Sequence, residues 1–110
     1  MPRYKMIALT SPFEGKDAEF NEWYQGTHLP QVCALPGVIG AQRYKRAAPL
    51  QDPFDREYLA IYDIETDDIR ELLGAFGAAA KSGQLTQTDS ADNTKAYTVI
   101  FEEFGERVEG

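Results

Sequence analysis

Cysteine and histidine are nearly absent from the sequence, since each occurs once among the 110 residues, as Cys33 and His28. A single cysteine excludes a disulfide bond within the chain. Zinc and non-haem iron sites usually take two or more histidine or cysteine side chains, so we expect no such metal site within one chain. Haem can be held by one histidine, and it is the cofactor alternative that this composition leaves open.

Basic charge and long apolar segments are also scarce. The chain has 11 lysines and arginines against 18 aspartates and glutamates, a formal net charge of −7. Because phosphate groups bind basic surfaces, we expect neither a nucleic-acid partner nor an anionic membrane. No apolar run approaches the ~20 residues of a membrane span, and the first residues hold no apolar region long enough for a signal peptide. These features predict a cytoplasmic protein.

Apolar residues, by contrast, make up 43% of the chain and follow regular patterns. The length suits one domain, residues 1–110, that can bury a core without a metal or a disulfide. Alternation between turn residues predicts strands at 4–10, 38–47, 56–65 and 95–104. Helical spacing predicts helices over 18–35 and 66–83, with Asp17 and Thr66 as N-caps. The order β-α-β-β-α-β is the ferredoxin-like α+β pattern, a four-stranded antiparallel sheet with two helices on one face.

The last predicted strand is apolar on both of its faces. Tyr97, Val99 and Phe101 alternate with Ala96, Thr98 and Ile100. Since both helices cover the same face of the sheet, the other face needs a second cover. We therefore predict a homodimer in which a second copy packs on the open face.

The segment "EWYQGTHLP", residues 22–30, carries the only tryptophan and the only histidine of the chain. Helical spacing places four ring-bearing side chains on one side, namely Phe20, Trp23, Tyr24 and His28. Pro30 cannot donate a hydrogen bond to the carbonyl of Gly26, and its ring crowds that carbonyl. We expect the helix to kink or to change pitch between Gly26 and His28, which turns the imidazole toward the gap between helix and sheet.

These residue types suit proton transfer. The unperturbed pKa of histidine lies near neutrality, so His28 is a candidate general acid or base. The hydroxyl of Tyr24, one helical turn away, could donate to an oxyanion. Trp23 and its aromatic neighbours could form an apolar wall for a ring-shaped ligand. The residues alone leave a second interpretation open, in which the aromatic side chains are core and His28 caps a backbone carbonyl.

Residues 18–46 resemble the EthD-like group of the dimeric α+β barrel proteins. In that group a helix ending in Trp-Tyr is followed by His-x-Pro, by Pro-Gly-Val and by a strand with Arg and Tyr. The matching residues here are Trp23, Tyr24, His28, Pro30, Pro36, Gly37, Val38, Arg43 and Tyr44. The superfamily includes cofactor-free monooxygenases, polyketide cyclases, isomerases, lyases and haem proteins. The resemblance implies His28 as acid or base, with Arg43 or Tyr44 near a ligand held between helices and sheet.

The resulting hypothesis is a cofactor-independent enzyme that acts on a small aromatic or polyketide-like molecule by proton transfer, as an isomerase, cyclase or lyase. His28 is its base and Tyr24 its hydrogen-bond donor. Candidate pocket walls are Phe20, Trp23, Tyr62, Tyr97 and Phe101. Strand alternation leaves open which face of the sheet Tyr62 and Tyr97 occupy. The alternatives are a cofactor-free monooxygenase, a non-catalytic protein that binds a small hydrophobic ligand, and a haem protein.

Overall fold

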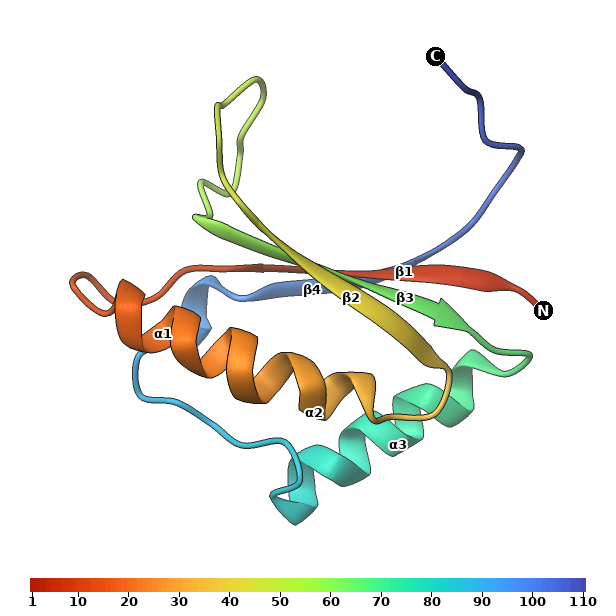
Figure 1. The fold of residues 1–110 in the computed structure, drawn as a ribbon, viewed down its shortest axis with the longest axis horizontal. Coiled ribbons are helices and arrows are strands. Elements are labelled where there is room, and N and C mark those ends of the chain that lie inside the picture. The colour runs from red at the N-terminus through yellow and green to blue at the C-terminus, as the bar shows by residue number, and fades with distance from the viewer.

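Four strands form one antiparallel sheet in the computed structural model, which describes residues 1–110, and all the helices lie on one face of that sheet (Figure 1). The strands are β1 (Arg3–Thr10), β2 (Val38–Lys45), β3 (Tyr58–Glu65) and β4 (Tyr97–Glu102), arranged in the order β2-β3-β1-β4. The predicted ferredoxin-like class is confirmed. Two strands begin two residues later than predicted. A 3-10 turn, Asn93–Lys95, precedes β4, and the side-chain Nε–H of Arg56 donates to the carbonyl of Lys95 at the end of that turn.

The first helical segment runs from Asp17 to Cys33 in three parts. An α-helix α1 (Asp17–Trp23) leads into a π-helical turn (Tyr24–His28) and then into a second α-helix α2 (Leu29–Cys33). Asp17 does not cap this helix as predicted, because its carboxylate accepts a hydrogen bond of 2.8 Å from the hydroxyl of Tyr58.

Helix α3 (Ile69–Ser82) corresponds to the second predicted helix and begins three residues after Thr66, the predicted N-cap. Asp68 is the N-cap, since its side chain accepts from the backbone N–H of Arg70. Thr66 instead accepts from the N–H of Asp68 and forms a turn before the helix. Gly83 ends α3 in a left-handed conformation, φ 83°, that suits glycine at a helix C-terminus.

The hydrophobic core lies between the sheet and the helices. Every second residue of β3 is buried there, namely Tyr58, Ala60, Tyr62 and Ile64. Phe20 and Val32 pack against them from the first helical segment, and Leu72 from α3. The opposite face of the sheet exposes large apolar side chains, among them Ile39, Tyr44, Tyr97 and Phe101. The sheet therefore has one buried apolar face and one open apolar face.

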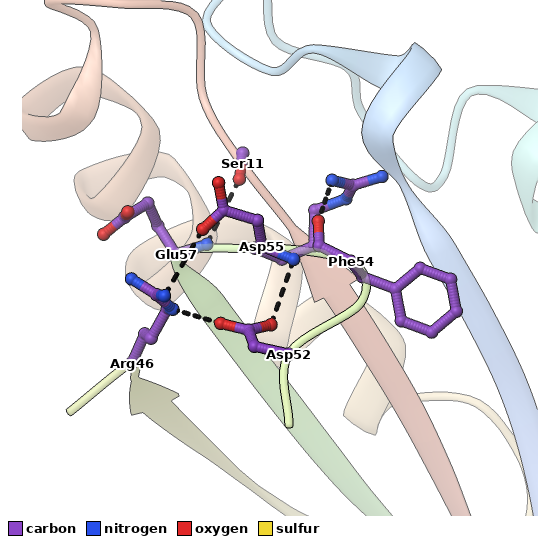
Figure 2. Close-up of polar contacts among 7 residues, drawn as sticks. Ser11, Arg46, Asp52, Phe54, Asp55 and Glu57 are labelled. Carbon is purple, nitrogen blue, oxygen red and sulfur yellow. Dashed lines mark hydrogen bonds and ion pairs between the residues drawn. The ribbon is translucent and has the colours of Figure 1, made fainter. Parts of the chain in front are cut away.

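Two segments extend beyond the open face, on the side away from the helices. They are the β2–β3 connection, residues 46–57, and the C-terminal residues 103–110 (Figure 1). Figure 2 shows what shapes the first of them. The guanidinium of Arg46 forms ion pairs with Asp52 and Asp55, and the backbone N–H of Asp55 donates to Asp52 at 3.0 Å. The backbone N–H of Glu57 donates to the hydroxyl of Ser11, which ties the connection to β1. None of the helices combines the length and the apolarity needed to cross a bilayer.

Candidate functional site

The helix that carries the histidine changes pitch where the sequence predicts it. In the π-helical turn Tyr24–His28, the N–H of Leu29 donates to the carbonyl of Tyr24, five residues earlier. Pro30, which has no N–H to give, follows directly, and the wider turn accommodates the missing α-helical bond. The predicted change of pitch is confirmed and begins two residues before Gly26. Single π-helical turns within α-helices occur frequently at functional sites.

The imidazole of His28 lies between two aromatic side chains. It stacks on Trp23 with ring centroids 4.6 Å apart and an interplanar angle of 20°, and it meets Tyr24 edge-on at 4.9 Å. Its Nδ1 atom is buried and has no hydrogen-bond partner. Because burial disfavours the charged ring, the pKa of His28 falls to about 4. At neutral pH the imidazole is uncharged and can accept a proton.

Two buried tyrosines form a hydroxyl pair at the same place. The hydroxyls of Tyr24, from the π-helical turn, and Tyr62, from β3, are 3.1 Å apart. Burial raises the pKa of both phenols, so both stay protonated. In such a pair one hydroxyl donates to the other, and the second hydroxyl hydrogen remains for an acceptor on a ligand.

These side chains line a cavity of about 160 Å³ between the helices and the sheet, here called the His28 cavity. Sixteen residues form its walls, and Phe20, Trp23, Tyr24, His28 and Tyr62 are among them. No aspartate, glutamate, lysine or arginine contributes to the lining. The structure therefore brings together five of the nine residues that the sequence singles out.

Arg43 lies next to this group but does not line the cavity. Its guanidinium carbon is 4.5 Å from the ring centroid of Tyr24 and 5.3 Å from that of Tyr58. It donates a 2.8 Å hydrogen bond to the side-chain oxygen of Asn21. These contacts hold the Tyr24 ring against β2 through cation–π attraction. The side chain thus supports Tyr24 in this structure and lies outside the cavity predicted to hold the ligand.

Tyr44, Tyr97 and Phe101 lie on the open face of the sheet and do not line the cavity. Successive residues of a strand point to opposite faces, so Tyr44 must oppose Arg43. On β4, Thr98 faces the cavity. Its neighbour Tyr97 and, by the same alternation, Phe101 must face away, and their exposed fractions are 39% and 57%. We expected these three side chains to surround a ligand together with His28. Within a single chain they do not, because they lie on the opposite face of the sheet.

The sequence did not identify the remaining walls. Phe76 of α3 closes one side, and Thr86 and Gln87 of the α3–β4 connection, residues 83–96, close another. Spacing could have found Phe76, since it follows the buried Leu72 by four residues. The connection carries no such periodic signal.

The α3–β4 connection is hydrogen-bonded to the helical segment on both sides of His28, through Trp23 of α1 and Gln31 of α2. The side-chain oxygen of Gln31 accepts from the backbone N–H of Thr86 at 3.0 Å, and the indole N–H of Trp23 donates to the hydroxyl of Thr86 at 3.3 Å. These contacts link residues that are more than fifty positions apart in the chain. They hold the connection in place as part of the cavity wall.

No family model and no curated protein sequence matches the chain. Solved structures do match. An EthD family protein from Bacillus halodurans c-125 is 24% identical, aligns over 94% of this chain and 100% of its own, and has a TM-score of 0.62. A monooxygenase candidate from Shewanella loihica PV-4 is 10% identical, with coverages of 96% and 99% and a TM-score of 0.61. A mutant of MhuD with two manganese protoporphyrin IX bound per active site is 18% identical, with coverages of 97% and 99% and a TM-score of 0.60.

The alignments extend over nearly the whole chain. Sequence identities this low support a shared fold and do not by themselves support a shared function. The sequence motifs around His28 and the structural neighbours point to the same architecture by separate routes. The chain has the fold of the dimeric α+β barrel proteins. Its residues 18–46 also resemble the EthD-like group of these proteins.

Proposed function

We propose that the protein is a cofactor-independent enzyme that acts on a small aromatic molecule by proton transfer, as an isomerase, cyclase or lyase. The observation that carries the proposal is that the uncharged imidazole of His28 and the hydroxyl pair of Tyr24 and Tyr62 line the same cavity, which has no charged residue in its walls. A neutral imidazole in such a cavity can take a proton from a bound molecule, and a tyrosine hydroxyl can donate to the oxyanion that results.

In the proposed reaction, neutral His28 takes a proton from a carbon next to a carbonyl group of the substrate. The electron pair moves onto the carbonyl oxygen, where the hydroxyl of Tyr24 or Tyr62 donates to the enolate. The imidazolium then returns the proton at another position. The low pKa of the unliganded histidine, about 4, favours the neutral base. The enolate that forms during the reaction would raise the pKa of His28 again, because an adjacent negative charge stabilises imidazolium.

A second candidate function is cofactor-free monooxygenation, which the likeness to a monooxygenase candidate favours. It would begin with the same proton abstraction, after which the substrate anion reacts with oxygen. Oxygen consumption that accompanies substrate loss, measured with an electrode, distinguishes the two. A further candidate function is ligand binding without catalysis. Tight binding of a ligand, with no product detected by mass spectrometry, would support it.

Haem is implied by the neighbour MhuD, whose active site holds manganese protoporphyrin IX. The His28 cavity does not fit such a group as it stands. An engineered cavity of about 150 Å³ holds one benzene ring, and the His28 cavity measures about 160 Å³. A porphyrin contains four linked pyrrole rings and is far larger. Addition of haem to the protein should therefore give no Soret band of a histidine-bound complex, and its appearance would require a rearranged site.

We also infer that the protein is a homodimer in the cytoplasm. Support for the dimer comes from the large apolar side chains on the open face, including Ile39 and Phe101, and from the two segments that extend beyond that face. Large apolar side chains gathered on one exposed face of a sheet are typical of an interface between protein chains.

The proposed function is tested by exchange of the acidic benzylic methylene protons of phenylacetone, an uncharged ketone with one aromatic ring, in D₂O followed by NMR. We expect the wild-type protein to accelerate exchange and His28→Ala to lower its rate by about 10²-fold or more. Tyr24→Phe should lower it by about tenfold or more, because it removes a donor to the enolate. Tyr44→Phe makes the same change on the open face and should have no effect. Wild-type exchange by a folded His28→Ala variant would overturn the proposal.

A further inference from the structure

A second hollow adjoins the His28 cavity and is twice its size. It measures about 320 Å³ and is here called the apolar groove, lined by seven residues of β1, α3 and β4. Thr98 is its only residue that is not hydrophobic. Three residues, Met6, Phe76 and Thr98, line both the groove and the His28 cavity. The two hollows are therefore neighbours with a shared wall.

The sizes of the two hollows limit what each can hold. The His28 cavity, at about 160 Å³, has room for about one aromatic ring. Sites for small molecules usually measure about 300–1,000 Å³. The His28 cavity reaches that range only together with the groove. A ligand that fills the whole site must therefore extend from the cavity past Met6 and Phe76.

The charges around the two hollows limit the ligand further. Neither hollow has an aspartate, glutamate, lysine or arginine in its lining. His28 is uncharged at neutral pH, since burial lowers its pKa to about 4. The nearby cation Arg43 is engaged with Asn21 and the Tyr24 ring, outside the cavity. A carboxylate or phosphate would lose its hydration there without a counter-charge, which is unfavourable.

The shared wall favours a flexible extension over a rigid one. Methionine is unbranched and adapts its shape readily, so Met6 can move aside for a narrow chain. Most of the groove is aliphatic, with Leu72, Leu73 and Ile100 among its residues. Such a lining offers dispersion contacts to methylene groups and no fixed hydrogen bonds.

We propose that this site takes an uncharged molecule with one planar ring, bound in the His28 cavity, and an apolar chain that lies in the apolar groove. The inference rests on the proposed function in that it takes the His28 cavity as the ligand site, and it adds the class of ligand. The ring carries the polar group that meets the hydroxyl pair, and the chain supplies most of the affinity.

The test is a binding series of phenol and its 4-ethyl, 4-butyl and 4-hexyl derivatives. Trp23 is the only tryptophan and stacks on His28, so its fluorescence reports on occupancy of the cavity. Each buried methylene group should lower Kd about fourfold until the groove is full. At neutral pH, 4-butylbenzoate, which carries a negative charge, should bind at least about tenfold more weakly than 4-butylphenol. Equal affinities of phenol and 4-hexylphenol, equal binding of the benzoate, or no binding of any phenol would overturn the proposal.

A matched pair of variants locates the chain. Leu73 lines the groove and has an exposed fraction of 52%, so Leu73→Asp introduces a charge there without disturbing the core. It should abolish the dependence on chain length and leave phenol binding unchanged. Leu50→Asp makes the same change in the β2–β3 connection, where the side chain is 99% exposed, and should keep the whole series intact. A chain-length dependence that persists in Leu73→Asp would contradict the assignment of the groove.

The binding series requires no turnover, so it can fail or succeed independently of the proposed reaction. If proton exchange is lost in His28→Ala while affinity shows no chain-length dependence, the proposed function stands and this inference is wrong. If the series holds while His28→Ala exchanges protons at the wild-type rate, the ligand class stands and the proton-transfer role is wrong.

Discussion

Mild acid should destabilise this protein through its single histidine. His28 is enclosed by Trp23 and Tyr24, and burial lowers its pKa in the folded state to about 4. In the unfolded chain its pKa is the ordinary value of about 6.5. Since the folded-state pKa is the lower one, the unfolded chain binds a proton first as the pH falls. The stability that depends on a neutral His28 is therefore fully present above pH ~6.5 and is lost as the pH falls from there through ~4.

The size of this effect follows from the two pKa values. Between about pH 7 and pH 5, protonation of His28 in the unfolded chain alone should lower the free energy of unfolding by about 1–2 kcal/mol. The lower part of that range allows for water that reaches the partly exposed ring. No other histidine titrates in this window, because the chain has only one. Hydrogen bonds from Arg46 and Thr94 lower the pKa of Asp52 and of Asp92, so these carboxylates titrate at more acidic pH.

The assay is urea-induced unfolding of the wild type and of His28→Phe at both pH values. Phenylalanine fills similar space and cannot be protonated, so the variant should lack the loss of about 1–2 kcal/mol. NMR titration of the imidazole gives a direct reading of the folded-state pKa. Equal losses of stability in the two proteins, or an imidazole midpoint near 6.5, would refute the reasoning that burial keeps His28 neutral.

Three further substitutions test the surroundings of the site. Arg43→Lys replaces the planar guanidinium that packs on Tyr24, and it should lower the free energy of unfolding by about 1–2 kcal/mol; unchanged urea unfolding would contradict this. Pro30→Ala restores an N–H that can donate to the carbonyl of Gly26, so the π-helical turn should tighten and the fluorescence of the adjacent Trp23 should change; an unchanged spectrum would contradict the role of Pro30 in the wider turn. Phe101→Glu on the open face should yield a folded monomer in sedimentation velocity, and a persistent dimer would exclude that face as the interface.

The fold was predictable because its signals are local. The alternation in β3, residues Tyr58–Glu65, matches the burial of every second side chain. The capping residues were harder, because several polar residues compete before each helix. Thr66, Asp67 and Asp68 all suit an N-cap by residue type, and in the structure Asp68 takes that position. Asp17 is likewise drawn from the predicted cap by the hydroxyl of Tyr58, forty-one positions away.

The candidate site divides in the same way. Phe20, Tyr24 and His28 lie on one helical segment, so spacing alone brings them together. The residues of the sheet are different, because an apolar strand with two apolar faces does not reveal which face is inward. The bulge between Val38 and Gly40 adds to this, since one extra residue inverts the alternation of β2. Arg43 therefore faces the helices and Tyr44 faces away, a choice that the local sequence does not contain.

The edge strand β4 contributes to both of the proposed binding surfaces. Thr98 and Ile100 line the apolar groove on the helix side, while Tyr97 and Phe101 belong to the open face. In a single chain β4 pairs only with β1, so its outer edge is free. A second copy that packs on the open face would hold β4 more firmly and would thereby fix the width of the groove. Binding of a long ligand and dimerisation should therefore favour one another, because each stabilises the same position of β4.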